Sequence, residues 1–302
     1  MLQPSSPEKS PDRHPFPLLT AQGLSGASFR PEHIADILAD SNPNVFFEIH
    51  AENYMGQGGM PHAALTHIRQ NNAVSLHGVA MNIGGPQDID TAHLQCFANL
   101  VERYQPCMVS EHLAWSTHDD IHFNDLLPVP YTDETLARIV SHIGQVQDAI
   151  KRPMLLENPS SYLQFAQSNW AETDFIREIA RRSGCGLLLD INNVFVSATN
   201  NGTSPEDYLA EFPLHLVGEI HLAGHDEQAD DEGAVLLIDS HNCAVADPVW
   251  ALYEHVLSQT GPIPTLVEWD ADVPAWAVLK SEAMAARRIM DQSGLARLSH
   301  VA

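Results

Sequence analysis

The stretch Val45-Phe46-Phe47-Glu48-Ile49-His50 is a short apolar run that ends in Glu and His, two residue types that bind metals. Similar runs, each ending in His, Asp or Glu, recur at fairly even spacing, at residues 74–77, 108–112, 154–157, 187–190, 216–221 and 265–268. Continuous apolar runs of this length are typical of strands that are buried on both faces, as in a parallel sheet. We therefore interpret the seven runs as parallel β-strands.

Segments with a helical pattern separate these runs, at residues 61–70, 92–104, 133–150, 172–182, 248–259 and 274–290. A first strand near 24–29, followed by a helix at 31–40, brings the number of strands to eight. Alternating strands and helices favour a parallel sheet with helical crossovers, and eight repeats of the strand pattern favour closure of the sheet. The sequence therefore predicts an α/β fold of the (β/α)8 TIM-barrel type.

The composition is that of a single globular domain. The chain has 302 residues, of which 44% are hydrophobic and 18% charged, a balance that can fill one barrel core. The polar, Pro-rich residues 1–20 are expected to form a disordered tail, and residues 21–302 one barrel domain. No apolar run approaches the roughly 20 residues of a membrane helix, and the tail lacks the apolar core of a secretory signal. We expect a cytoplasmic protein with no membrane partner.

Charge and cysteine content exclude several classes of function. The formal net charge is −24, which disfavours nucleic acid as a partner because its phosphates would be repelled. None of the four cysteines forms a C-x-x-C pair, so neither a zinc ribbon nor a thioredoxin motif is present. We expect reduced thiols at Cys96, Cys107, Cys185 and Cys243.

The polar ends of the predicted strands indicate a metal site. In a barrel of this type, the active site lies at the carboxyl ends of the strands. So many carboxylates around one barrel mouth would repel each other unless cations compensated them. His nitrogen mixed with carboxylate oxygen, without thiolate, suits iron, manganese or zinc. The number of candidate ligands exceeds what one ion needs, so two or three ions bridged by carboxylates fit better.

Strand periodicity sorts some of these side chains. Residues two apart share a face of a strand, so Glu48 with His50, and Glu219 with His221, can project together. The same holds for Asp239 and His241, which follow the apolar run 235–238. Glu111 and His112 are adjacent, so only one of them can face inward if the strand is regular.

Eight motifs in order resemble one known family. They are EIHAENYM (48–55), SLHGV (75–79), SEHLAWS (110–116), LLENPSSY (155–162), LLDINNVFVS (188–197), GEIHLAGH (218–225), IDSH (238–241) and VEWD (267–270). Over residues 23–290 the chain resembles the multinuclear non-heme iron-dependent oxidative enzymes, formerly catalogued as a domain of unknown function. These are relatives of the iron oxidase of methanobactin biosynthesis, and the resemblance implies a xylose isomerase-like TIM barrel.

The resemblance also implies a chemistry and a set of partners. It implies an oxidoreductase with two or three iron ions of mixed Fe(II)/Fe(III) valence and dioxygen as co-substrate. The substrate would be a cysteine of a ribosomally synthesised precursor peptide, and some members need a partner protein that recognises the peptide leader. The activity is thus a post-translational modification in the biosynthesis of a peptide natural product.

Carried over residue by residue, the resemblance implies three sets of metal ligands. The first is His50, His77 and Glu157; the second is Glu157 as a bridge with Asp190, His221 and Glu268; the third is Asn193, Asp239 and His241. Glu111, His112 and Asp270 are the candidate catalytic or substrate-side groups. Two positions depart from the family pattern, with Asn201 where His is usual and Ser28 where Gly is usual.

Two other functions fit the same ligands. A metal-dependent hydrolase or sugar isomerase would use them for Lewis-acid chemistry without dioxygen. A non-catalytic metal-binding protein would saturate the coordination of its ions, whereas catalysis keeps positions open. Redox activity separates the first alternative from an oxidase, because a hydrolase should work with zinc and without oxygen.

Overall fold

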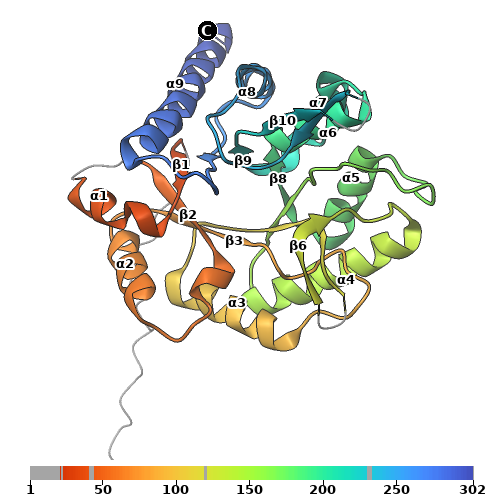
Figure 1. Ribbon diagram of the computed structural model, residues 1–302, viewed down its shortest axis with the longest axis horizontal. Helices are drawn as coiled ribbons and strands as arrows, with labels where there is room; N and C mark the ends of the chain where they lie inside the picture. The colour runs from red at the N-terminus through yellow and green to blue at the C-terminus, as the bar shows by residue number, and fades with distance from the viewer. Residues whose placement is uncertain (1–20, 22, 41–43, 119–120, 230–232, 302) are drawn as a thin grey trace, which may run out of the picture.

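The computed structural model describes residues 21, 23–40, 44–118, 121–229 and 233–301, and the tail expected at 1–20 lies outside them. Eight parallel strands close into a barrel in the order β1-β12-β9-β8-β7-β4-β3-β2 (Figure 1). Their bounds are β1 (Ser25–Ser28), β2 (Phe46–His50), β3 (Val74–Gly78), β4 (Met108–His112), β7 (Leu155–Glu157), β8 (Gly186–Asp190), β9 (Val217–Leu222) and β12 (Thr265–Val267). The predicted TIM barrel is therefore confirmed.

Helices surround the barrel where the sequence pattern predicts them. They are η1 (Pro31–His33) with α1 (Ile34–Ala39), α2 (Met60–Arg69), α3 (Thr91–Tyr104), α4 (Asp133–Ile150), α5 (Glu172–Ser183), α8 (Asp247–Thr260) and α9 (Trp276–Val301). The last helix is longer than predicted, since it continues to residue 301. Among the described residues, no helix is both long and apolar enough to cross a membrane.

Several further elements lie between the strands and are not predicted by the sequence pattern. They are the 3-10 turns η2 (Ala51–Tyr54) and η3 (Leu214–Leu216), the helices α6 (Ile191–Asn201) and α7 (Pro205–Glu211), and two hairpins, β5 (Trp115–His118) with β6 (Ile121–Leu127) and β10 (Asp226–Ala229) with β11 (Val235–Ile238). The sequence of α6 is rich in Asn and β-branched residues, which are poor helix formers. Its start is stabilised by Asp190, whose Oδ1 accepts a hydrogen bond from the Asn193 amide at 2.6 Å. One residue thus ends a strand and caps a helix.

Apolar side chains fill the amino-terminal end of the barrel. Phe46 and Leu266 are fully buried there and pack with Ala21 and Ala73. Gly26 leaves room for the ring, because a Cβ at this position would lie 2.4 Å from Phe46 Cζ. With this end filled by side chains, the polar groups of the barrel lie toward the carboxyl ends of its strands.

Candidate metal centre

The fold gathers the predicted ligands at one end of the barrel. Four of them are the last residues of their strands: His50 of β2, His112 of β4, Glu157 of β7 and Asp190 of β8. His77 and His221 are the last but one of β3 and β9, and Glu268 follows β12. We call these residues, together with His241, the strand-end cluster. Within and just beneath it, five groups of three side chains have ligand atoms within 4.8 Å of one another: His77–His112–Glu157, Glu48–Glu219–His221, His50–Glu268–Asp270, Glu157–Asp190–His221 and Asp190–His241–Glu268.

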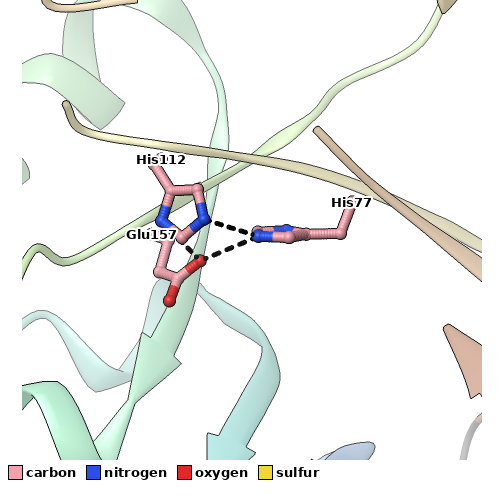
Figure 2. A group of neighbouring side chains, drawn as sticks. All are labelled: His77, His112 and Glu157. Atoms are coloured by element: carbon pink, nitrogen blue, oxygen red, sulfur yellow. Dashed lines mark hydrogen bonds and ion pairs between the residues drawn. The ribbon is translucent and has the colours of Figure 1, made fainter. Parts of the chain in front are cut away.

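The first group is the tightest (Figure 2). His77 Nε2 lies 2.8 Å from His112 Nε2 and 3.4 Å from Glu157 Oε2, and His112 Nδ1 lies 3.2 Å from the same oxygen. Burial lowers the pKa of both rings, that of His112 to about 4. Both imidazoles are therefore neutral near pH 7 and free to donate a lone pair to a metal.

His112, and not His50, has a ligand atom in the group of His77 and Glu157. The two side chains from β2 and β3, His50 and His77, face each other with ring centroids 5.9 Å apart. His50 groups instead with Glu268 and Asp270. Asp270 forms an ion pair with Arg30, a half-buried guanidinium that follows β1. His112, predicted as a substrate-side residue, thus lies among the candidate ligand atoms.

The second group surrounds His221. Its Nδ1 lies 3.4 Å from Glu268 Oε2, and its ring is fully buried. Glu157 and Asp190 have ligand atoms in the same group as His221. Burial opposes a charge on the ring, but Glu268 and Glu48 outweigh it and raise the pKa of His221 well above its ordinary value. Without metal, a proton on this ring balances the carboxylates around it.

The third predicted set, Asn193, Asp239 and His241, is only partly assembled. His241 has a left-handed backbone (φ 47°), and its Nε2 folds back to 2.8 Å from Asp239 Oδ1. Its Nδ1 lies 3.4 Å from Glu268 Oε2. Asn193 donates its amide to Glu157 Oε1 at 3.3 Å, and its own Oδ1 has no hydrogen-bond partner in the described part of the chain. The structure thus brings His241 to Glu268 and Asn193 to Glu157.

A close backbone approach fixes the position of His241. The His241 amide donates to the Gly224 carbonyl at 3.1 Å, which holds the segment after β11 against the end of β9. Gly224 permits this contact, because a Cβ there would lie 2.3 Å from the Cys243 carbonyl oxygen. The segment after the hairpin β10–β11 therefore brings a candidate ligand, His241, to the cluster from outside the barrel strands.

Glu111 lies away from the cluster. Its Oε1 accepts a hydrogen bond from the Met81 amide at 2.6 Å, and its Oε2 accepts one from the His112 amide at 2.5 Å. Burial, followed by the charge of Glu52, raises the pKa of Glu111 well above its ordinary value. Of the adjacent pair on β4, His112 faces the cluster, and Glu111 holds the loop after β3.

Buried polar atoms that lack a hydrogen-bond partner among the described residues test whether the cluster fits metal ions. Glu157 Oε2, Asp190 Oδ2, Asn193 Oδ1 and both ring nitrogens of His221 are buried and have no hydrogen-bond partner among the described residues. Such atoms cost free energy unless something else satisfies them. Each is a nitrogen or oxygen donor of a type that iron, manganese or zinc accepts. The residues present therefore fit a set of divalent metal ions.

A cavity of about 210 Å³ opens over the cluster. Its floor includes His50, His77 and His112, and Leu126 of β6 lines its wall. Tyr162 reaches across from the loop after β7, and its hydroxyl accepts a hydrogen bond from the Asp239 amide at 2.8 Å. A larger cavity of about 800 Å³ lies on the other side of this loop, and its lining includes Asn201. The site can thus receive an organic substrate directly over the ligand atoms.

Asp190 gives the metal-free protein a pH-dependent stability that can be measured. Burial, followed by the charge of Asp239, raises the pKa of Asp190 from 3.8 to about 7. Because the folded pKa exceeds the unfolded one, the stability linked to this group is complete below pH 3.8 and is lost as pH rises to about 7. Asn cannot ionise, yet it caps a helix as Asp does.

We therefore expect metal-free Asp190→Asn to gain stability over the metal-free wild type as pH rises through this window. The gain should be on the order of 1.4 kcal/mol for each pH unit between the two pKa values, and it should level off above the folded pKa. Denaturant unfolding in a chelating buffer at several pH values measures it. A stability difference that does not change with pH would contradict the buried, shifted carboxyl.

Comparisons with known proteins agree with this geometry. Residues 24–291 match the family model described as RiPP precursor modification enzyme MbnB/TglH/ChrH. A UPF0276 protein of Rhizobium meliloti is 62% identical over 278 residues, which cover 92% of this chain and 90% of the relative. A UPF0276 protein of Paraburkholderia phytofirmans is 60% identical over 269 residues, covering 89% and 88% of the two chains.

Solved structures with the same fold are more distant in sequence. A D-psicose 3-epimerase from Clostridium cellulolyticum, solved with D-tagatose, superposes with a TM-score of 0.57 at 10% identity, covering 90% of this chain and 99% of that one. Endonuclease IV from Thermus thermophilus gives a TM-score of 0.57 at 12% identity, covering 89% and 99%. These similarities show a xylose isomerase-like barrel and carry no argument about the reaction.

Proposed function

Because the chain belongs to the RiPP precursor modification enzymes described as MbnB/TglH/ChrH, we propose that it is a multinuclear, iron-dependent oxidase that uses dioxygen. Its substrate would be a cysteine of a ribosomally synthesised precursor peptide, in some cases presented by a partner protein that recognises the leader. The observation that carries the proposal is the strand-end cluster, a set of His and carboxylate donors with unmatched atoms under a cavity.

Three sets of residues would hold the ions. His77, His112 and Glu157 make up the first, in which the contacts favour His112 over His50. Asp190, His221 and Glu268 make up the second, with Glu157 as the shared ligand. His241 would complete a third with Glu268 and Asp190, and with Asp239 and Asn193 at its edge.

The protein contributes arrangement and exclusion of water. When bound, the iron ions would supply the one-electron chemistry that lets dioxygen oxidise a thiol. The peptide cysteine would enter the cavity between Leu126 and Tyr162, above His112. Asp270 stands at the rim, held by Arg30, where it can orient a backbone amide of the peptide. Glu111 supports this arrangement indirectly, since it holds the backbone amide of His112.

The donor set supports iron chemistry more than a single zinc. A zinc hydrolase site uses three protein ligands and one open position, whereas this cluster offers seven strand-end residues and His241 within a few ångströms. Neutral imidazoles and carboxylates without thiolate are also the ligands of non-heme iron oxygenases.

The metal content of the purified protein tests the proposal of a multinuclear iron oxidase. Protein purified without chelators and protected from iron loss is expected to contain more than one iron per chain, because the cluster has more donors than one ion can use. Elemental analysis of the purified protein, with a buffer control, gives the ratio. A single zinc per chain, with no activity supported by iron, would overturn the oxidase proposal in favour of the hydrolase or isomerase alternative.

A further inference from the structure

A second layer of polar side chains lies beneath the strand-end cluster, inside the barrel. Glu48 of β2 and Glu219 of β9 are each two residues before a cluster histidine and are at most 2% exposed. Glu219 Oε2 accepts a hydrogen bond from the hydroxyl of Ser75 at 3.1 Å. The family resemblance gives no role to either glutamate, although the two-residue spacing marks both as inward-facing.

The oxygens of Glu48 and the ring nitrogens of His221 are buried next to each other, and among the described residues neither set has a hydrogen-bond partner. The ring of His221 lies between two carboxylates, with Nδ1 at 3.4 Å from Glu268 Oε2 and Nε2 at 3.5 Å from Glu48 Oε2. These distances are those of ion pairs, slightly longer than hydrogen bonds. Both nitrogens of the ring and both oxygens of Glu48 have no hydrogen-bond partner among the described residues. Glu268 belongs to the cluster, whereas Glu48 lies on the interior side.

We propose that Glu48 is a positioning residue that accepts the Nε2–H of His221, which leaves Nδ1 as the nitrogen that binds metal. This inference rests on the proposed metal centre. A neutral imidazole that binds a metal through one nitrogen carries its proton on the other, and in a dry site that N–H needs an acceptor. A carboxylate behind a histidine fixes the ring orientation and tautomer and makes the ligand more basic.

The surroundings of Glu48 on the other side from His221 are polar. Its side chain borders a further cavity, of about 290 Å³. Ser28, Arg30 and His50 also line this further cavity. The cavity is large enough for several water molecules, at roughly 30 Å³ each, and Ser28 Oγ is another buried polar atom without a partner there. Arg30 adds a favourable charge, since it interacts electrostatically with Glu48.

The alternative interpretation is that a cation binds inside the barrel between Glu48, Glu219 and His221, because their ligand atoms also lie within 4.8 Å of one another. That ion would need Nε2 as a ligand. A neutral ring whose Nδ1 already binds a metal at the Glu268 side carries a proton on Nε2 and has no lone pair left there. A metal count that includes Glu48 variants separates the two readings.

The test is a metal titration of chelator-stripped protein with Fe(II) in the absence of oxygen, for wild type, Glu48→Gln and Glu48→Leu. Leu removes the acceptor, so one ion should bind about 10–100-fold more weakly, with the others unchanged. Gln keeps an acceptor oxygen and loses the charge, so it should fall between Leu and wild type. The Mössbauer parameters of that one iron should change in both variants. Glu172→Gln is the control, because this half-buried carboxylate is held by Tyr131 and Tyr208 outside the cluster.

Stability controls and alternative outcomes keep the test decisive. Denaturant unfolding of the metal-free variants is the stability control, because a cooperative transition in Glu48→Gln and Glu48→Leu shows that weaker binding does not reflect misfolding. Unchanged affinity at every site would overturn the proposal. The proposal would also be overturned if Glu48→Gln lost one ion completely while the remaining irons kept normal Mössbauer parameters. That result would mean that Glu48 is a direct metal ligand. A wild type that binds several ions but does not oxidise a peptide contradicts the proposed function alone, and one that binds none contradicts both.

Discussion

Glu157→Gln is expected to remove two metal ions together and to reduce peptide oxidation below detection. Glu157 Oε2 lies 3.4 Å from His77 Nε2 and 3.2 Å from His112 Nδ1, and a Glu157 oxygen also groups with Asp190 and His221. An amide has no charge and one weak donor oxygen, so it cannot bridge two cations as a carboxylate does. The loss should exceed the roughly 10–100-fold typical of residues behind a ligand.

Gln is a suitable replacement because it resembles the metal-free state of this residue. Burial raises the pKa of Glu157 well above its ordinary value, which favours the neutral acid when no metal is present. Metal-free Glu157→Gln should therefore unfold like metal-free wild type. Elemental analysis and Mössbauer spectra give the iron count, and Glu172→Gln again serves as the control. If one ion only is lost, or none, Glu157 is not a bridge.

The barrel could be predicted because its signal is local and repeated. Each apolar run, such as 45–50, is short enough for a strand and is followed by a helical pattern, so every unit gives the same indication independently. The strand ends then locate the site, because carboxyl ends of parallel strands meet at one edge. Six of the nine proposed metal ligands lie in the strand-end cluster for this reason: His50, His77, Glu157, Asp190, His221 and Glu268. His241 joins them from the segment after β11.

Contacts between strands could not be predicted in the same way. Strand periodicity predicts that only one of Glu111 and His112 faces inward. The structure shows that it is His112, which pairs with Glu157 across β4 and β7. The distance of His50 from Glu157 likewise depends on barrel geometry and not on spacing. The left-handed backbone of His241 turns its ring back onto Asp239, whereas an extended Asp-x-His segment was expected.

Some elements carry too weak a local signal to be found. The helix α6 has few good helix formers, and tertiary contacts override its low propensity: it packs on β9 and β11, and Asn200 exchanges two hydrogen bonds with Leu237 at 2.8 Å. Glu48 and Glu219 were visible as inward-facing residues, but their relation to His221 arises only when β2, β9 and β12 close around it.

The reacting thiol is expected to come from the peptide and not from the enzyme. Cys→Ser in the peptide should abolish turnover, because an alcohol is far less acidic than a thiol and is a harder, weaker ligand for iron. The enzyme's own thiols are poorly suited. Burial raises the pKa of Cys107 to about 12 and that of Cys185 to about 11, and Cys96 lies on helix α3.

Cys243 is the enzyme thiol nearest to the ligands, two residues after His241. Burial raises its pKa, and its Sγ donates to the His225 carbonyl at 3.4 Å. It is absent from the lining of the cavity over the cluster. Each of the four Cys→Ala variants should therefore retain wild-type iron content and turnover. Loss of turnover in Cys243→Ala with normal iron content would mean that an enzyme thiol takes part.

The most direct test is the mass of a cysteine-containing precursor peptide encoded beside the gene, after incubation with iron-loaded protein and any leader-binding partner. The account predicts a mass change in air that is absent without oxygen, absent with zinc in place of iron, and absent for the Cys→Ser peptide. A reaction that proceeds with zinc and without oxygen, or an unchanged peptide with iron in air, would contradict it.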